Sequence, residues 1–277
     1  MLSYRHIPSR RILLVAAGLT LLSVSTLGHL PESEDAAASV DPPAPGGGPG
    51  TAAIPASAQQ PSERATPRAP AGPATPIRDP AKRRPVYELS PERKVVALTI
   101  DDGPDPRYTP TVLSLLRKYG IRATFFIVGE NAQAHPELVR AIAEEGHHVA
   151  NHTWSHPDLR QLSEARVREE LEHTSEVLHR ATGRAPTWFR APGGDFSQAS
   201  LTTSAELGMR PMAWSVDPRD WSRPGTSLIT SRVLEAVRPG SIVLNHDGGG
   251  DRSQTIAALQ TYLPVLIDGG YFFTAPA

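Results

Sequence analysis

The sequence predicts an α/β fold, a distorted (β/α) barrel of about seven strands, over residues 86–277. Apolar runs of strand length alternate there with longer amphipathic segments, and this alternation is typical of a parallel sheet covered by helices. About seven repeats of the unit favour a sheet that curls into a barrel. Polar clusters follow five of the apolar runs, at the strand ends where barrels carry their functional sites.

The expected strands are short apolar runs, each followed by polar residues or by a glycine or proline that favours a turn. The first has the sequence Val-Val-Ala-Leu-Thr-Ile and leads into Asp101-Asp102-Gly103-Pro104. Strands are expected at Val95–Ile100, Ala123–Val128, His147–His152, Thr187–Ala191, Met209–Val216, Ser241–His246 and Tyr271–Ala275.

The segments between these runs have apolar residues at helical spacing. In Thr109–Tyr119 the apolar face consists of Val112, Leu115 and Leu116. The longest segment begins at Ser163, a residue suited to an N-cap, although Arg166 stands where a glutamate would complete a capping box. Helices are expected at Thr109–Tyr119, His135–Glu145, Ser163–Thr182, Ser197–Leu207, Ser227–Val237 and Ser253–Ile267.

The N-terminal part of the chain does not belong to this fold. Residues 1–30 are predicted to be a signal peptide or a signal anchor, because Arg5, Arg10 and Arg11 precede an apolar stretch from Ile12 to Leu22. Residues 31–85 are rich in Pro, Ala and Gly. They contain too few apolar side chains to offset the entropy of folding, so a disordered linker is predicted.

Composition excludes several kinds of site. The 277 residues include no cysteine, which excludes disulfides, thiolate metal ligands and cysteine nucleophiles. The formal net charge is −1, so there is no electrostatic basis for a nucleic-acid partner. Any metal ligand must therefore come from His, Asp, Glu or water.

Asp101 and Asp102 stand side by side at the end of the first expected strand. Two adjacent carboxylates at the end of a buried strand repel each other, and their burial costs desolvation. The usual compensation is that one binds a cation while the other handles a proton. A plain surface turn is the alternative, since Asp and Gly favour turns.

His152 and His156 follow the third expected strand with i, i+4 spacing. On a helical turn, this spacing places two imidazoles on one side, within reach of one cation. A pair of solvated loop histidines is the alternative. With an aspartate from the first strand end, the pattern predicts a site of two histidines and one carboxylate. Such a site suits zinc, or another borderline divalent ion such as cobalt or nickel.

Five motifs resemble, in order, those of the polysaccharide deacetylases of carbohydrate esterase family 4, which share the NodB homology domain. They are Thr99–Pro104 (TIDDGP), His152–His156 (HTWSH), Arg190–Gly194 (RAPGG), Asp217–Trp221 (DPRDW) and Leu244–His246 (LNH). The resemblance covers about residues 93–277. It implies that residues 86–277 form a NodB-type domain that removes acetyl groups from a polysaccharide.

The resemblance implies which residues bind the metal and which one takes up a proton. Asp102, His152 and His156 would hold the cation. Asp101 would be the general base, and Arg190 would pair with it and fix its orientation.

The later motifs would complete the reaction. His246 would be the general acid, with Asp220 holding it in its charged form. The backbone N–H of Gly193 would stabilise the oxyanion, but many family members have an aromatic residue at this position, so part of the sugar site is expected to differ. Trp221 and Leu244 would form a small apolar pocket for the acetyl methyl group; plain core packing is the alternative for both.

The expected function is metal-dependent removal of acetyl groups from an extracytoplasmic polysaccharide, namely N-acetylglucosamine of peptidoglycan or chitin-type oligomers. The N-terminal segment would leave the enzyme secreted or tethered to the membrane, and a monomer is expected. The alternatives are an acetylxylan esterase, a catalytically silent carbohydrate-binding protein of the same fold, and an amidohydrolase acting on a small molecule. Silent relatives usually lose the base or the acid, whereas this chain retains Asp101 and His246, and an export signal disfavours the small-molecule enzyme.

Overall fold

The structure is a computed structural model that describes residues 75–90 and 93–276. The expected leader, residues 1–30, and residues 31–74 of the expected linker lie outside the described residues. Regular structure begins before the boundary expected at residue 86, because a 3-10 helix spans Pro80–Arg83 and the Ile77 amide donates to the Ala205 carbonyl at 2.7 Å. None of the helices in this part of the chain combines the length and the apolar character that a membrane span requires.

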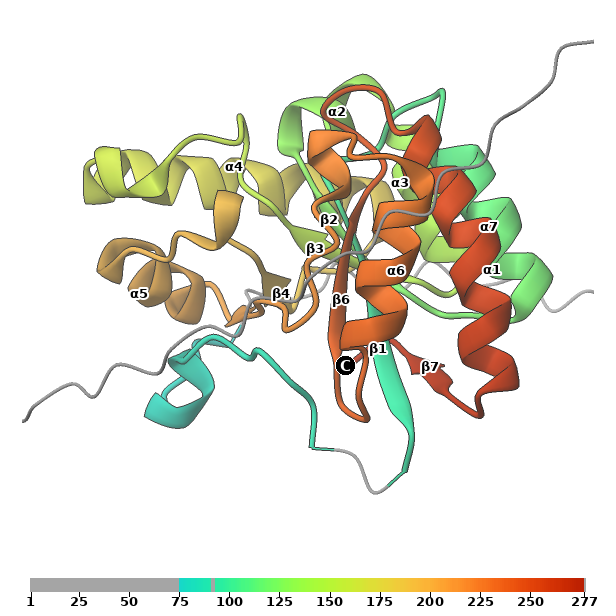
Figure 1. Ribbon diagram of the computed structural model, residues 1–277. Helices are drawn as coiled ribbons and strands as arrows, with labels where there is room; N and C mark the ends of the chain where they lie inside the picture. The colour runs from blue at the N-terminus through green and yellow to red at the C-terminus, as the bar shows by residue number, and fades with distance from the viewer. Residues whose placement is uncertain (1–74, 91–92, 277) are drawn as a thin grey trace, which may run out of the picture. The chain divides into compact units, whose positions relative to one another are not determined.

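Seven parallel strands form one curled sheet flanked by helices (Figure 1). The strand order is β5-β4-β3-β2-β1-β6, and β7 pairs with the beginning of β1. The predicted fold class is therefore confirmed, with the sheet forming a half-barrel. The strands are β1 (Val95–Asp101), β2 (Thr124–Ile127), β3 (His148–Asn151), β4 (Trp188–Phe189), β5 (Arg210–Pro211), β6 (Ile242–His246) and β7 (Phe272–Thr274).

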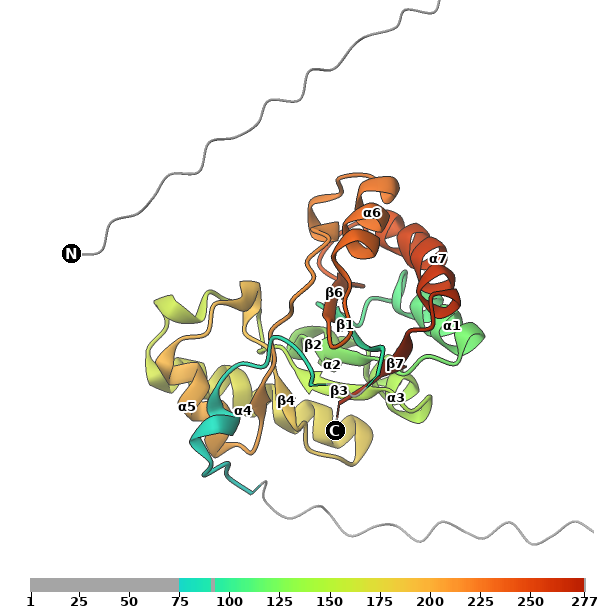
Figure 2. The same cartoon turned by 60° about the horizontal axis from the view of Figure 1, so that its bottom comes forward.

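The helices form two groups around the sheet (Figure 2). One group, α1, α6 and α7, packs together beside β1 and β6, and the other, α2, α3, α4 and α5, lies beside β3 and β4. The helices are α1 (Thr109–Tyr119), α2 (Gly129–Ala134), α3 (Pro136–Glu144), α4 (Glu164–Thr182), α5 (Gln198–Glu206), α6 (Thr226–Ala236) and α7 (Ser253–Asp268). All six predicted helices are present; α2 was not predicted.

Helix α4 begins and ends as its sequence predicts. The side chain of Ser163 accepts a hydrogen bond from the Arg166 amide at 3.4 Å, which is the half of a capping box that this sequence retains. At the other end, Gly183 has a φ of 70°, and glycine adopts this left-handed conformation without strain.

Alternation along β1 decides which side chains face the inside of the half-barrel. Val96, Leu98 and Ile100 pack into the main core with α1 and α7. Ala97 belongs to a second core cluster within the curled sheet. Because side chains alternate along a strand, Asp101 lies on the same face as Ala97.

The run Met209–Val216 was predicted to be one strand, but only Arg210–Pro211 pairs with β4. The chain then crosses toward β6, where the amides of Ser215 and Val216 both donate to the Ile242 carbonyl. The segment 86–88 also spans from β5 to β6, because Val86 forms an isolated bridge with Met212 and Glu88 forms one with Ser241. The segments 86–88 and 212–216 therefore connect the two open edges of the half-barrel, and the apolar run is longer than β5 because its second half makes this connection.

Candidate active site and metal centre

The register of the sheet gathers the predicted motifs at one edge. Asp101, the last residue of β1, pairs with His246, the last residue of β6. On the other side of β1, Asn151 ends β3 and pairs with Phe189 at the end of β4. The residues that follow them, His152 and Arg190, therefore emerge beside Asp101.

A cavity of about 310 Å³ opens at this edge. Eight of the ten predicted site residues line it, and the other two, Arg190 and Asp220, contact lining residues from behind. The eight are Asp101, Asp102, His152, His156, Gly193, Trp221, Leu244 and His246.

Asp102, His152 and His156 are arranged to share one cation. The Oδ1 atom of Asp102 lies 3.4 Å from His152 Nε2 and 3.3 Å from His156 Nε2. The three ligand atoms all lie within 4.8 Å of one another. Asp102 Oδ1 is buried without a hydrogen-bond partner, a state that is costly unless a cation compensates it. One carboxylate and two imidazoles fit zinc or a similar divalent ion.

The two histidines are in the right form to be ligands. His152 Nδ1 lies 2.8 Å from the Arg190 carbonyl oxygen. A carbonyl can only accept, so Nδ1 carries the proton and donates, which leaves the Nε2 lone pair free to face Asp102. Burial, with the nearby His152, lowers the pKa of His156 and favours its neutral form.

Asp102 is in its charged form. Burial by itself would raise its pKa, but the contact with His152 and the charge of His246 outweigh burial and hold the pKa well below its usual value. A deprotonated carboxylate is the form that binds a cation.

Residues 152–156 do not form the helical turn on which i, i+4 spacing would place two imidazoles on one side. The segment is a loop, in which Thr153 and His156 have positive φ values of 68° and 57°. The two rings nevertheless lie with their centroids 5.0 Å apart. The left-handed backbone of the loop therefore brings the two imidazoles together, as a helical turn would have done.

Backbone strain in the described residues gathers around this site. Besides Thr153 and His156, the residues other than glycine with positive φ are Asp102, Arg219 and Arg223. Asp102 belongs to the group formed with His152 and His156, and the two arginines flank the 3-10 helix Asp220–Ser222. Non-glycine residues in this conformation cost of order 1 kcal/mol each and are typical of functional sites.

Asp101 is bound to Arg190 and does not belong to the group of Asp102, His152 and His156. Arg190 Nη1 donates to Asp101 Oδ1 at 2.6 Å, and both side chains are buried. The other guanidinium bonds go to the carbonyls of Met212 and Ala213 and to the Thr99 hydroxyl. Asp101 Oδ2 is left facing His152, 3.8 Å from its Nε2.

His246, the register partner of Asp101, is paired with Asp220. Their Nδ1 and Oδ1 atoms lie 2.7 Å apart. The other oxygen, Oδ2, accepts hydrogen bonds from the His246 amide and the Thr255 hydroxyl, both at 2.9 Å. Burial alone would lower the pKa of His246, but the charge of Asp220 outweighs it and raises the pKa to about 9. The imidazole is therefore protonated at neutral pH, with Nε2 available to the cavity.

Gly193, Trp221 and Leu244 form other parts of the cavity wall. Gly193 has a φ of 64°, where a residue with a side chain would be strained. Trp221 is 52% exposed, so plain core packing does not describe it, whereas Leu244 is buried.

Two residues around the site, Trp214 and Glu170, were not assigned a role from the sequence. Trp214 lines the cavity and fills the space beside Gly194, where an added Cβ would lie 2.8 Å from the indole. Glu170 of α4 is buried behind the loop that carries His156. For Trp214 the only sequence signal was an aromatic residue shortly before the fourth motif; Glu170 gave no signal.

Known proteins similar to this chain include polysaccharide deacetylases, as the five sequence motifs predicted. The sequence model of a family described as polysaccharide deacetylase matches residues 88–212. A chitooligosaccharide deacetylase of Bradyrhizobium sp. is 45% identical over 203 residues, which cover 69% of this chain and 92% of the relative.

Two solved structures extend this comparison. The structure of the peptidoglycan N-acetylglucosamine deacetylase Bc1960, solved with a hydroxamate-type benzamide, is 38% identical with a TM-score of 0.66, covering 68% of this chain and 88% of that one. BA3943 of Bacillus anthracis, described as a pseudoenzyme of carbohydrate esterase family 4, is 31% identical with a TM-score of 0.65, covering 69% of this chain and 66% of that one.

Proposed function

The chain belongs to the polysaccharide deacetylase family, carbohydrate esterase family 4, and on that basis we propose that it is a metal-dependent hydrolase of acetylated glycans. We propose N-acetylglucosamine units of peptidoglycan or of chitin-type oligomers as its substrate. Related proteins named for these two substrates support the choice.

One observation carries the metal dependence. The buried Oδ1 atom of Asp102 has no hydrogen-bond partner and faces the Nε2 atoms of His152 and His156 at 3.4 and 3.3 Å. A structural ion pair would leave neither an orphaned oxygen nor two imidazoles directed at the same point.

The remaining side chains supply the proton transfers. A bound divalent cation would polarise the acetyl carbonyl and lower the pKa of the attacking water. Asp101, oriented by Arg190, accepts the proton of that water through its free Oδ2. The Gly193 amide donates to the oxyanion that develops on the carbonyl oxygen. His246 then gives its Nε2 proton to the leaving nitrogen, while its Nδ1 keeps a proton that it donates to the Asp220 carboxylate.

An extracytoplasmic location is part of the proposal. It rests on the basic and then apolar pattern of residues 1–30, and it agrees with a substrate that is a cell-wall or external polymer. The enzyme would then be secreted, or tethered to the membrane by this segment.

The experiment that tests the function measures acetate release by chelator-treated protein before and after zinc is added. Peptidoglycan, chitooligosaccharides and acetylated xylan are compared as substrates. We expect release from one or both N-acetylglucosamine polymers only after zinc is restored. Release from xylan alone would favour an acetylxylan esterase, and no release from any polymer by the zinc-loaded protein would contradict the proposal.

The second candidate is a catalytically silent carbohydrate-binding protein. The similarity to BA3943, which is described as a pseudoenzyme, is the observation that supports it. Against it, a buried aspartate paired with arginine and a histidine that is protonated at neutral pH line one cavity. Binding of an acetylated oligosaccharide with no turnover by the zinc-loaded protein would favour it.

Asp220→Asn is expected to move the alkaline limb of the kcat/KM profile to lower pH. A general acid works only while protonated, so wild-type kcat/KM should fall as the pH rises through about 9, the pKa of His246. Without the carboxylate, burial dominates and the imidazole loses its proton at lower pH. The pH dependence of kcat/KM measures this, and Asp217→Asn is the control, since Asp217 also lines the cavity but accepts from the amide of Arg219 in its own loop. An unmoved limb in Asp220→Asn would contradict the assignment of His246 as the acid.

A further inference from the structure

Helix α4 carries one buried glutamate that the proposed mechanism does not use. Glu170 is 4% exposed, whereas its neighbours Glu169, Glu172 and Glu176 lie in surface ion pairs with arginines. None of the ion pairs among the described residues includes Glu170. A buried carboxylate without a cationic partner is stable only if strong hydrogen-bond donors surround it.

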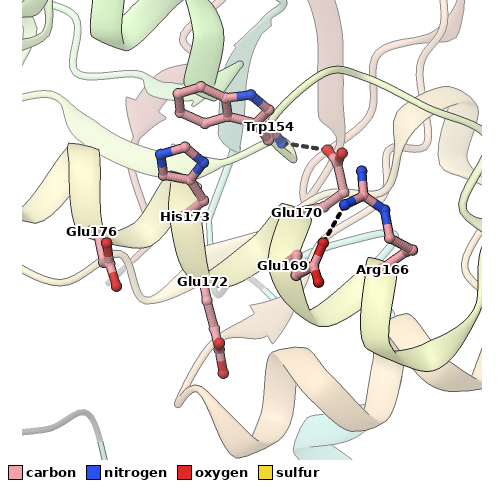
Figure 3. A pocket seen from close by; sticks show the side chains of 7 residues that line it. All are labelled: Trp154, Arg166, Glu169, Glu170, Glu172, His173 and Glu176. Atoms are coloured by element: carbon pink, nitrogen blue, oxygen red, sulfur yellow. Dashed lines mark hydrogen bonds and ion pairs between the residues drawn. The ribbon is translucent and has the colours of Figure 1, made fainter.

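Those donors all come from the two residues in the middle of the loop between His152 and His156. The amides of Trp154 and Ser155 both donate to Glu170 Oε2 at 2.8 Å, and the Ser155 hydroxyl donates to Oε1 at 3.0 Å. Figure 3 shows the Glu170 carboxylate directed at the backbone of Trp154.

Side-chain oxygens bind every amide of the loop from residue 153 to residue 156. The Thr153 amide donates to Asn151 Oδ1 at 2.9 Å, and the His156 amide donates to Thr153 Oγ1 at 3.1 Å. Glu170 accepts the two amides in between. It is the only one of these acceptors that lies outside the loop and its adjoining strand, so it ties the loop to α4.

The side chain of Trp154 makes a second contact with α4. Its indole stacks on His173, with ring centroids 3.6 Å apart and planes 10° from parallel (Figure 3). The indole also lies against Gly129 of α2, where an added Cβ would be 2.4 Å from Cε3. The loop is therefore packed between α2 and α4, and Glu170 fixes its backbone.

The groove beside this contact does not form a cation site of its own. It measures about 440 Å³ and is lined by Trp154, His173, Arg166 and four glutamates of α4. Three of those glutamates pair with arginines and the fourth, Glu170, binds the loop amides. Every carboxylate that lines the groove therefore already has a partner within the protein.

The two histidine ligands depend on the loop to different degrees. His152 is oriented by the Arg190 carbonyl. In the described part of the chain, the ring of His156 pairs with no carboxylate other than Asp102, and its side chain is 43% exposed. The position of His156 is therefore set by the loop backbone, whose carbonyls at Thr153 and Trp154 are bound by α2 and whose amides at Trp154 and Ser155 are bound by Glu170 of α4.

We propose that Glu170 is a positioning residue for the metal centre, fixing the loop that sets the distance from His156 to Asp102 and His152. This inference rests on the proposed metal site. Groups that orient metal ligands without touching the metal contribute about 10–100-fold to metal affinity.

Two variants of Glu170 separate reach from charge. Glu170→Gln removes the charge but keeps the length: its carbonyl can accept both amides, and its NH₂ can donate to the Ser155 hydroxyl. Glu170→Asp keeps the charge but is one methylene shorter, so it cannot reach both amides from its place on the helix. We expect zinc affinity within about 3-fold of wild type for the glutamine variant. For the aspartate variant we expect an affinity about 10–100-fold weaker.

The measurement is competition of the chelator-treated protein with a chromogenic zinc chelator. A visible absorption spectrum with cobalt in place of zinc reports the ligand geometry without any need for activity. The aspartate variant should alter the cobalt spectrum, whereas the glutamine variant should retain it. Glu169→Ala, which removes the exposed neighbour, is the matched control and should leave both readouts unchanged.

The opposite ranking, with aspartate like wild type and glutamine weakened, would overturn the inference, because charge and not reach would then decide affinity. Wild-type affinity in both variants would overturn it as well. If the wild-type chain does not bind zinc, the metal centre itself is refuted. If the wild type binds zinc and the aspartate variant binds it equally well, only the role of Glu170 is refuted.

Discussion

Asp101→Asn is expected to lower kcat by about 10⁴-fold, the upper end of what a general base contributes. An amide cannot take the proton of the attacking water, yet its oxygen can still accept the hydrogen bond from Arg190 that the carboxylate accepts at 2.6 Å. The geometry is therefore preserved while the chemistry is removed. The effect should appear in kcat with little change in KM, because the lost function operates only in the transition state.

The zinc content of the same Asp101→Asn sample distinguishes a base from a ligand. Asp102, His152 and His156 remain, so the variant should bind zinc as tightly as the wild type. Loss of zinc in this variant would mean that the division of work between the two adjacent aspartates is wrong.

His246→Ala is expected to lower kcat for an N-acetyl substrate by about 10²–10⁴-fold, the usual contribution of a general acid. An amine is a poor leaving group until its nitrogen is protonated, and His246 is the group in the cavity whose pKa, about 9, keeps it protonated at neutral pH. Near-wild-type rates would remove His246 from the mechanism. His135→Ala, at the start of α3, is the control for loss of a histidine away from the site.

An activated ester sharpens the test of His246. The phenolate of 4-nitrophenyl acetate departs without being protonated, so the loss in His246→Ala should be much smaller with this ester than with the amide. Asp101→Asn should be impaired with both substrates, because each needs an activated water. Equal losses of both variants on both substrates would contradict the separate roles of base and acid.

Much of the fold was predictable because local patterns and tertiary structure agree. The apolar run Val95–Ile100 becomes β1, and the amphipathic segment Thr109–Tyr119 becomes α1 with the same bounds. Ser163 caps α4 as its position suggested. The polar clusters at strand ends gather on one cavity because parallel strands present their C-terminal ends at the same edge.

The features that were missed depend on contacts between distant segments. Helix α2 has six residues and no apolar stripe, and its first amides bond to the carbonyls of Thr153 and Trp154 instead of following a local signal. The spacing of His152 and His156 suggested a helix because sequence alone does not reveal left-handed backbone at Thr153. Glu170 is one of several glutamates on α4, and only the packing of α4 against the loop between His152 and His156 makes it different from its neighbours.

Calorimetric titration of the chelator-treated chain with zinc, in the wild type and in Asp102→Ala, tests the central claim most directly. We expect one zinc bound per wild-type chain and no detectable binding by Asp102→Ala, because the oxygen that both imidazoles face is gone. Unchanged zinc binding by the alanine variant, or none by the wild type, would contradict a metal centre built on Asp102, His152 and His156.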